Sequence, residues 1–311
     1  MVSYLKIIFL IGPTSSGKTD LSVLLGRRLP IEIISVDSAM VYRGMDIGTA
    51  KPSYKDLLDI PHRLINICDP IDSYSVFEFY KDSVKAIHDI IKRGRIPMLV
   101  GGSMFYFKSL FSGGFSVLPS NNKEIRLYIS NKANKIGWKK MYQKLKKIDF
   151  TSACRIHPND IQRISRALEV FFVSGKTITE LSKNFLKNSI FDKYKTYKFI
   201  VFPYNKSLLH KRIERRFYDM LSLGFENEVR LLFSRGDLTE NMPSMKCIGY
   251  RQMLLYITGS INYNDMINRA IFATKNLAKR QITWIKKWNN FYCLDSENIF
   301  ESLDKVLRIV L

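Results

Sequence analysis

The first 120 residues alternate between short apolar runs and segments with helical periodicity. Four apolar runs predict buried strands, at residues 5–11, 32–36, 62–67 and 96–100. The segments at 20–29 and 76–93 instead carry apolar residues at helical spacing. Alternation of this kind predicts an α/β fold in which helices cover a parallel sheet, and such sheets bind ligands at the carboxyl ends of their strands.

The pattern changes near residue 121. Residues 121–190 read as helices with no clear strand, and an apolar run at 197–202 then returns to the sheet. The simplest organisation is a core domain formed by 1–120 and 196–311, interrupted by an all-helical insertion domain at 121–195. Beyond the insertion we expect helices at 207–222, 224–234, 247–257 and 263–288, then an edge strand at 292–294 and a final helix.

Positive charge is concentrated in the middle of the chain. The net charge of the whole chain is +21, of which +12 falls on residues 121–200, +3 on the preceding residues and +6 on those that follow. A basic block favours a polyanionic partner, most simply nucleic acid. The sequence is also rich in Lys, Asn and Ile throughout, so a bias of base composition remains an alternative explanation of the lysines.

Cysteine usage and hydropathy exclude several classes of protein. The four cysteines have no metal-type spacing and form no cluster with the histidines, so we expect reduced thiols and no zinc site. No apolar run approaches the ~20 residues of a membrane span. The apolar start of the chain runs directly into a glycine-containing loop, which favours a first strand over a signal peptide. We therefore expect a cytoplasmic protein with no membrane partner. We also expect a monomer, although the sequence does not reveal the oligomeric state.

A phosphate-binding loop follows the first predicted strand. Its residues are Gly12-Pro13-Thr14-Ser15-Ser16-Gly17-Lys18-Thr19, which fit G-x-x-x-x-G-K-[ST] between a strand and a helix. The glycines let the backbone wrap so that its N–H groups point at phosphate oxygens. Lys18 adds a positive charge against the terminal phosphate, and the Thr19 hydroxyl is placed to hold Mg²⁺. The loop predicts a polyphosphate ligand without saying which one.

Further motifs carry a specific resemblance. They are Ser35–Pro52, Gly101–Tyr106, Ile156–Asp160, Gln162–Glu169, Ile248–Gln252 and Thr274–Trp284. With these motifs the chain closely resembles, nearly end to end, the bacterial tRNA dimethylallyltransferases, also called tRNA isopentenyltransferases. One departure is Ser103, where the family usually has Thr; the hydroxyl is kept and a methyl contact is lost.

The resemblance implies a reaction. A dimethylallyl group would pass from its diphosphate to N6 of adenosine 37, beside the anticodon of a tRNA, with the help of Mg²⁺. Fixed N–H groups, Lys18 and the metal would stabilise the charge that develops on the diphosphate. The sequence has no D-D-x-x-D cluster, so the phosphate loop is its only good anion site.

Asp37 is the candidate general base, because it follows the second strand. We expect that strand to lie beside the one that feeds the phosphate loop, so that Asp37 faces the same crevice. By position alone a metal-holding or capping role is as good an explanation, and the resemblance favours catalysis. Ser103 ends another core strand and is a second candidate for contact with the reacting groups. Arg212 and Arg216, one helical turn apart, are suited to clamp the diphosphate, although a solvated helix face explains them equally well.

The resemblance also implies surfaces that contact tRNA. These are Asp37-Ser38-Ala39-Met40, Ser103, Ile125, Ile161-Gln162-Arg163-Ile164-Ser165, Met242-Pro243-Ser244-Met245-Lys246-Cys247 and Lys275-Asn276-Leu277-Ala278-Lys279-Arg280-Gln281-Ile282. Lys275 and Lys279 share one helical face, as phosphate contacts require. The tryptophans at 284 and 288 are expected to be core residues rather than a base-stacking platform, and the lysines of 132–147 are compatible with simple solvation.

Three other functions are compatible with parts of the sequence. A nucleotide kinase or NTPase would share the loop, but no acceptor-phosphoryl site or arginine lid is evident before residue 121. An adenylate isopentenyltransferase acting on free nucleotides would not need the large basic surface. An RNA-binding protein without activity would leave Asp37 and the loop together unexplained. The chain has no Cys/His spacing typical of a C-terminal zinc finger, which favours the short bacterial form of the family.

Overall fold

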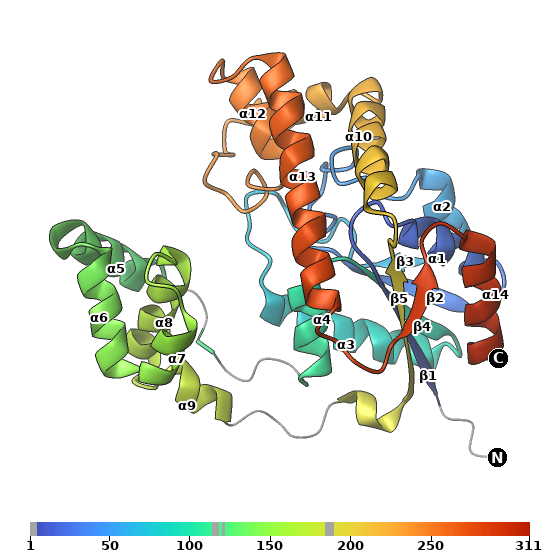
Figure 1. Cartoon of the computed structure of the whole chain (residues 1–311), viewed down its shortest axis with the longest axis horizontal. Coiled ribbons are helices and arrows are strands. Elements are labelled where there is room, and N and C mark those ends of the chain that lie inside the picture. The colour runs from blue at the N-terminus through green and yellow to red at the C-terminus, as the bar shows by residue number, and fades with distance from the viewer. Residues whose placement is uncertain (1–4, 114–117, 120–121, 184–189) are drawn as a thin grey trace. The chain divides into compact units, whose positions relative to one another are not determined.

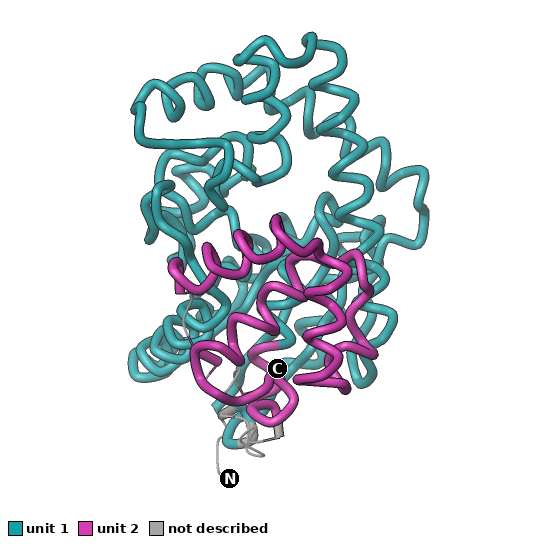
Figure 2. The backbone as a smooth tube through the Cα atoms, turned by 90° about the vertical axis from the view of Figure 1, so that its left-hand side faces the viewer, with its two compact units in different colours: residues 1–108, 191–311 teal, residues 109–190 magenta. Residues whose placement is uncertain are grey.

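The chain folds into two compact units. The computed structural model describes residues 5–113, 118–119, 122–183 and 190–311. One unit, the core unit, comprises residues 1–108 and 191–311; the other, the insertion unit, comprises residues 109–190 (Figure 2). The sequence places these boundaries at 121 and 195, so the compact insertion unit starts and ends earlier in the chain than the pattern indicates.

The core unit is built on a parallel sheet. Its described strands are β1 (Lys6–Ile11), β2 (Ile31–Val36), β3 (His62–Arg63), β4 (Ile96–Gly101), β5 (Lys195–Phe202) and β6 (Tyr292–Asp295). They lie in the order β3-β2-β4-β1-β5-β6, and every neighbouring pair is parallel (Figure 1). The predicted α/β class is thus confirmed, and β6 is the expected edge strand. Continuous apolar strands suit a parallel sheet because both of its faces are covered.

The expected neighbourhood of β1 and β2 is wrong, because β4 lies between them. Gly101 at the end of β4 is paired with Ile11 on one side and with Val36 on the other. A Cβ atom at Gly101 would lie 2.0 Å from the carbonyl oxygen of Val36, so only glycine fits there. The three strands therefore end in one row, and the residues that follow them emerge together at the same edge of the sheet.

The third strand is shorter than the sequence indicates. The apolar run at 62–67 forms only two residues of strand. Leu64 and Asn66 have φ angles of 62° and 57°, in the left-handed region, which ends the extended conformation. An apolar pattern carries no signal for such backbone reversals.

Helices cover both faces of the sheet. Ile8 and Leu10 of β1 belong to an apolar core that is completed by α1 (Lys18–Gly26) and α14 (Ile299–Val310). Phe9 alternates to the other face and contacts Phe107 of α4 (Met104–Phe111) with ring centroids 6.5 Å apart. Helix α3 (Val76–Lys92) packs against β2 and β4. The short α2 (Tyr54–Asp59) precedes β3.

A second core of the unit is formed by helices after β5. They are α10 (Lys206–Ser222), α11 (Phe225–Phe233), α12 (Tyr250–Ile257) and α13 (Tyr263–Ile285). Phe225 and Tyr250 are fully buried and pack edge to face, with centroids 5.1 Å apart. Val41, Tyr42 and Met45, from the segment after β2, belong to the same cluster. This packing joins the C-terminal helices to the segment that carries the candidate base.

The insertion unit has its own small helical core. Its described helices are α5 (Lys123–Ile136), α6 (Trp138–Ile148), α7 (Phe150–Arg155), α8 (Ile161–Ser174) and α9 (Ile178–Lys183). Apolar side chains such as Ile129, Met141 and Leu168 form the core. The remaining described helix of the chain is the 3₁₀ turn η1 (Ile190–Lys193), before β5. Among the helices of the described ranges, none combines the length and the apolar character needed to cross a bilayer.

An ion cluster around a buried carboxylate occupies the end of the motif at 162–169 in the insertion unit, and it pairs Arg166, which the sequence suggests as a phosphate contact, with Glu169. Glu169 of α8 is fully buried and accepts hydrogen bonds from the guanidinium groups of Arg126 and Arg166, each at 2.9 Å, and from the backbone N–H of Asn122 at 2.8 Å. Arg166 also donates to the carbonyl oxygen of Pro119 at 2.7 Å. Burial alone would raise the pKa of Glu169, but these hydrogen bonds hold it below its usual range.

Candidate active site

A cavity of about 670 Å³ lies at the carboxyl ends of β1, β2 and β4, and all of its lining residues belong to the core unit. The phosphate loop forms one part of the wall, with Lys18 and Thr19. The ends of β2 and β4 supply Asp37 and Ser103. Helices α10 and α13 complete it, and Arg216 is one of their contributions. The strand ends thus gather the residues that the motifs single out.

The phosphate loop has the conformation of an anion-binding turn. Ser15 and Gly17 have φ angles of 59° and 81°, so left-handed residues alternate along it, as in backbone nests. The hydroxyl of Ser16 is buried without a hydrogen-bond partner among the described residues. Such an orphaned donor suits a phosphate oxygen.

Lys18 is a cation held in a poorly solvated place. It begins α1, and its ammonium donates to the carbonyl oxygen of Pro13 at 3.2 Å. Burial, followed by the nearby charge of Arg216, lowers its pKa to about 8, while the negative charge of Asp37 acts in the opposite direction. A bound polyanion would reverse this shift, since an opposite charge favours the charged form.

The expectation that the N–H groups of the loop point at phosphate is wrong for part of the loop. The N–H of Gly12 donates to Gly101 at 3.3 Å, and that of Ser16 donates to Pro13 at 3.3 Å. The N–H of Thr14 donates to the side-chain oxygen of Gln281 at 2.9 Å. These amides hold the shape of the loop.

The two arginines of α10 differ in position. Arg216 lines the cavity and donates only a long hydrogen bond, 3.4 Å, to the carbonyl oxygen of Thr49. Burial lowers its pKa, partly offset by the charge of Asp37. Arg212 instead donates to the carbonyl oxygen of Ser296 at 2.9 Å and is not part of the cavity lining. The structure therefore brings Arg216 to the phosphate loop and leaves Arg212 outside the site.

Asp37 lines the cavity, and only one of its carboxylate oxygens accepts hydrogen bonds from the described residues. Its Oδ1 accepts hydrogen bonds from the backbone N–H groups of Ala39 at 2.8 Å and of Met40 at 3.2 Å. Its Oδ2 has no hydrogen-bond partner within the described ranges. The turn-capping role and an open oxygen thus coexist in one side chain. Asp37 also lies close enough to Lys18 and Arg216 to influence the pKa of both.

Ser103 links the end of β4 to the segment of Asp37. Its backbone N–H donates to the carbonyl oxygen of Val36 at 3.2 Å, and its hydroxyl oxygen accepts from the N–H of Ser38 at 3.1 Å. The hydroxyl thus performs, as expected, a hydrogen bond that does not need the methyl group of Thr. Cys247 lies nearby in the cavity wall, where burial and then the charge of Asp37 raise the pKa of its thiol to about 12.

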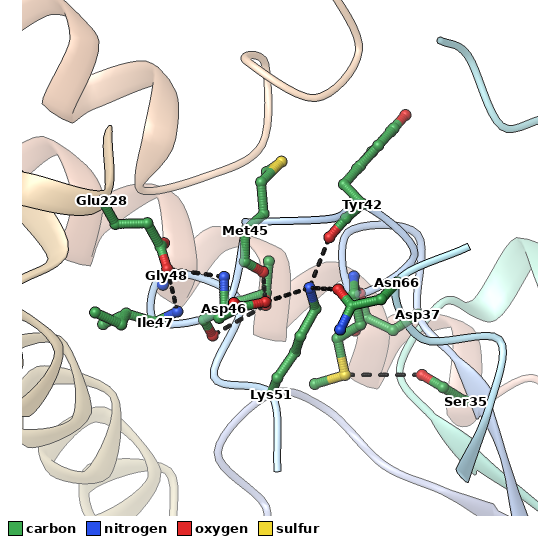
Figure 3. A network of polar contacts seen from close by, with 12 residues as sticks. Ser35, Asp37, Tyr42, Met45, Asp46, Ile47, Gly48, Lys51, Asn66 and Glu228 are labelled. Atoms are coloured by element: carbon green, nitrogen blue, oxygen red, sulfur yellow. Dashed lines mark hydrogen bonds and ion pairs between the residues drawn. The ribbon is translucent and has the colours of Figure 1, made fainter. Parts of the chain in front are cut away.

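Glu228 holds the segment after Asp37 in place. Its carboxylate accepts hydrogen bonds from three successive backbone N–H groups, those of Asp46 at 2.8 Å, Ile47 at 2.7 Å and Gly48 at 3.1 Å (Figure 3). The phenol of Tyr250 donates to the same carboxylate at 2.5 Å. A side chain at Gly48 would overlap the ring of Phe225, at 2.1 Å, which explains the glycine.

Lys51 stabilises the same segment from within. Its ammonium donates to the carbonyl oxygen of Tyr42 at 2.6 Å, to Asp46 at 2.6 Å and to Asn66 at 2.5 Å (Figure 3). This lysine belongs to the motif at 35–52, whose pattern indicates no role for it. The only sequence signal for Lys51 is its place in that motif, and no sequence feature indicates Glu228.

The residues expected to contact tRNA in the core unit differ in position. Those that line the cavity are Asp37, Ser38, Ala39, Met40, Ser103, Pro243, Lys246, Cys247, Leu277, Arg280 and Gln281. Ser244, Met245 and Ala278 are instead buried, and the Ser244 hydroxyl donates to the carbonyl oxygen of Pro70 at 2.6 Å. The structure gives these three side chains packing roles. Lys275 is paired with Glu214, and Lys279 is exposed.

The insertion unit carries the other expected contacts. Ile161, Gln162 and Arg163 are exposed at the start of α8, and Arg163 forms an ion pair with Asp160 at 3.3 Å. Ile164 is fully buried in the core of the unit, so its side chain serves packing. Ile125 and Ser165 are partly buried.

The expectation for the tryptophans needs a refinement. Trp284 and Trp288 pack edge to face with centroids 6.5 Å apart, and both are only partly buried. Trp284 also lines the cavity. It is therefore a partly buried residue of the cavity wall, with the ammonium of Lys108 5.8 Å from its ring centroid, and amphipathic spacing along a helix does not reveal this place.

The fold and the cavity define a phosphate-loop α/β protein with a helical insertion. The family model described as "IPP transferase" matches residues 40–288, which is most of the chain. The chain therefore belongs to the IPP transferase family and is a prenyltransferase enzyme.

Solved structures agree with this assignment. The full-length tRNA isopentenylpyrophosphate transferase of Bacillus halodurans is 32% identical, with a TM-score of 0.70 over 97% of this chain and 96% of that one. The tRNA Δ(2)-isopentenylpyrophosphate transferase of Staphylococcus epidermidis is 32% identical, with a TM-score of 0.69 over 98% and 99%. A eukaryotic dimethylallyltransferase acting on tRNA is 28% identical, with a TM-score of 0.77 over 94% of this chain and 74% of that one.

Proposed function

We propose that this enzyme transfers a dimethylallyl group from dimethylallyl diphosphate to N6 of adenosine 37 in tRNA. The observation that carries the proposal is that Lys18, Arg216 and Asp37 line one cavity. Two cations and a carboxylate at a single site suit a reaction in which an anion departs while a proton is removed.

The donor end of the cavity has the charge that diphosphate requires. Lys18 and Arg216 have no carboxylate hydrogen-bonded to them within the described ranges, and burial lowers the pKa of both. Diphosphate would supply the missing negative charge and the acceptor for the orphaned hydroxyl of Ser16. Apolar side chains such as Met104 and Ile213 also line the cavity and suit the five-carbon chain.

The residues present fit Mg²⁺ as the metal that assists the reaction. The described residues contain no group of three His, Cys, Asp or Glu side chains able to hold a metal by themselves. Mg²⁺ is commonly held by one or two protein oxygens together with substrate phosphates and water, and Thr19 supplies such an oxygen in the cavity wall. When bound, the metal would neutralise charge on the departing diphosphate.

The chemical step is a substitution at the allylic carbon. The bond between that carbon and the diphosphate oxygen breaks, the bond to N6 of adenine forms, and diphosphate leaves with the electron pair. N6 loses one proton, which the open Oδ2 of Asp37 accepts. Lys18 and Arg216 stabilise the leaving group, and Ser103 fixes the segment of Asp37 through Ser38.

The acceptor base must leave its stack to reach this site. Enzymes that modify a stacked base extrude it into a pocket, and loop RNA is read through splayed bases. Trp284 in the cavity wall offers a flat surface to such a base, and the exposed Lys279 and Arg280 suit the neighbouring phosphates of the RNA. The exposed Ile161, Gln162 and Arg163 are the proposed contacts of the insertion unit.

The test is direct. The protein is incubated with dimethylallyl diphosphate, Mg²⁺ and unmodified tRNA, and the nucleosides are analysed by mass spectrometry. N6-dimethylallyladenosine that maps to position 37 is the expected product, and tRNA with adenosine 37 replaced by guanosine is the matched control. A parallel incubation with free AMP tests the free-nucleotide alternative. Product from AMP alone, or labelled ATP turnover without prenyl transfer, would contradict the proposal.

A further inference from the structure

The side chain of Gln281 occupies a position that the reaction scheme leaves unused. Gln281 lies in α13 and is 7% exposed. Its Oε1 accepts a hydrogen bond from the backbone N–H of Thr14 at 2.9 Å, and its Nε2 donates to the carbonyl oxygen of Gly102 at 2.8 Å. One carboxamide thus joins the phosphate loop to the residue that follows β4.

Both partners fix the orientation of the carboxamide. The flipped arrangement would set the NH₂ group against the N–H of Thr14 and the oxygen against the oxygen of Gly102, which is repulsive at both ends. A carboxylate at this position would lose the donor, and an apolar side chain would leave two polar groups unpaired. The position therefore requires a side chain with a donor and an acceptor side by side.

The absence of a side chain at Gly102 makes room for this contact. A Cβ atom there would lie 2.7 Å from Nε2 of Gln281 and 3.1 Å from the carbonyl oxygen of Gly12. The two glycines of the Gly101-Gly102 pair are thus required for different reasons. Gly101 avoids a clash with the backbone of β2, and Gly102 leaves room for the side chain of Gln281.

The carboxamide is connected to the segment of the candidate base through neighbouring residues of the chain and one further hydrogen bond. Gly102 precedes Ser103, whose hydroxyl accepts from the N–H of Ser38, the residue after Asp37. Gln281 therefore stands between the diphosphate side and the proton-accepting side of the cavity. The segment around it was expected to contact tRNA, and its burial and two protein partners indicate another role.

We propose that Gln281 is a positioning residue that sets the phosphate loop against the end of β4, so that diphosphate and Asp37 are held in register. This rests on the proposed function for the transfer step. Its effect on the loop is separable, because inorganic diphosphate binds without any transfer.

The experiment compares Gln281→Met, which keeps the volume and removes both hydrogen bonds, with the wild-type enzyme. Titration calorimetry with inorganic diphosphate and Mg²⁺ should show an affinity roughly tenfold lower, since two buried polar groups lose their partners. The KM for dimethylallyl diphosphate should rise and kcat should fall, while the KM for tRNA stays within about twofold, because the contact lies on the loop. Gln143→Met, a matched change of an exposed glutamine in α6, should leave diphosphate affinity unchanged.

Two further variants distinguish positioning from general stability. Gln281→Glu keeps the acceptor for Thr14 and loses the donor for Gly102 until its carboxyl is protonated, so its diphosphate affinity relative to wild type should recover as the pH falls. Gly102→Ala should lower diphosphate affinity in the same direction as Gln281→Met, because its Cβ displaces the carboxamide. The double variant should lose no more affinity than Gln281→Met alone, since that change already removes both hydrogen bonds. Folding is checked by circular dichroism in each case.

Clear results would overturn the proposal. A folded Gln281→Met enzyme with wild-type diphosphate affinity would do so, as would one that loses only affinity for tRNA. If wild type binds diphosphate but transfers no prenyl group to tRNA, the proposed function fails while the diphosphate titrations still decide the role of Gln281.

Discussion

Charged side chains are arranged differently at the cavity of the core unit and in the interior of the insertion unit. In the core unit, Lys18 and Arg216 line the cavity without a hydrogen-bonded carboxylate within the described ranges. In the insertion unit, the buried carboxylate of Glu169 is enclosed by Arg126, Arg166 and a backbone N–H. Removing one partner of a buried charge pair destabilises a fold because it leaves the other charge uncompensated, whereas cations without a counter-charge are prepared for a ligand. The comparison therefore separates residues that hold structure from residues that hold substrate.

The largest expected effect is on the candidate base. Asp37→Ala should lower kcat by roughly 10²–10⁴-fold, the usual contribution of a general base, and leave tRNA affinity largely intact. Single-turnover transfer and filter binding measure the two quantities. Asp59→Asn, at an exposed carboxylate that pairs with Arg27 at 3.6 Å, is the control and should behave as wild type. Near-normal turnover of the Asp37 variant would remove this residue from the role.

Arg216→Met tests the ligand side of the comparison. The variant should lose roughly 10- to 100-fold in kcat/KM for dimethylallyl diphosphate, as expected for a lost charged hydrogen bond of about 1.5–3 kcal/mol. Its thermal stability should be equal to or above that of wild type, because a desolvated cation has been removed. Arg212→Met is the matched control, one helical turn earlier in α10. It should lower kcat/KM for dimethylallyl diphosphate far less. A variant at Arg216 that melts much earlier than wild type would place it among the structural charges.

Glu169→Ala tests the structural side. It should destabilise the insertion unit by about 1–3 kcal/mol, a reduced value because the two arginines keep partial contact with water. Diphosphate affinity should not change. Because the pKa of Glu169 in the folded protein lies below its ordinary value of 4.5, its contribution is present above that pH and is lost as the pH falls through the folded pKa. Amide hydrogen exchange in α8, measured at increasing denaturant concentration, reports the stability of the insertion unit. Unaltered protection of the α8 amides in the variant would contradict this account.

The smallest expected effect is a pH dependence of donor capture. The ammonium of Lys18 has a pKa of about 8 in the free protein, so its charge is present below that pH and is lost as the pH rises through it. The kcat/KM for dimethylallyl diphosphate, which reports the free enzyme, should therefore decline above about pH 8. Lys18→Arg, whose guanidinium stays charged, should lower the overall rate and shift the decline to higher pH. A decline at the same pH in both enzymes would assign it to another group.

The sequence predicted the parts of the fold that rest on periodicity. The apolar runs at 96–100 and 292–294 became β4 and β6, and amphipathic spacing located α3 and α13. The order of the strands in the sheet could not be predicted from the sequence. It depends on tertiary pairing, in which β4 lies between β1 and β2 and Gly101 pairs with both. The short β3 depends on positive φ angles at Leu64 and Asn66, which apolar residues do not announce.

The sequence predicted the motif residues of the candidate site but not the residues that hold its backbone in place. The phosphate loop, Asp37 and Ser103 carry local signals, and the structure gathers them at one cavity. Arg216 and Arg212 had equal standing in the sequence, and only the packing of α10 separates them. Glu228 and Gln281 act through backbone groups far away in the chain, so no local pattern indicates which amides they serve.

The most direct test is a crystal structure with the acceptor in place. The complex would contain a tRNA anticodon stem-loop and a thio analogue of dimethylallyl diphosphate that resists ionisation. We expect the diphosphate between Lys18 and Arg216, and N6 of adenosine 37 within hydrogen-bond distance of Asp37 Oδ2. Diphosphate bound elsewhere, or an adenine amino group directed away from Asp37, would contradict the account.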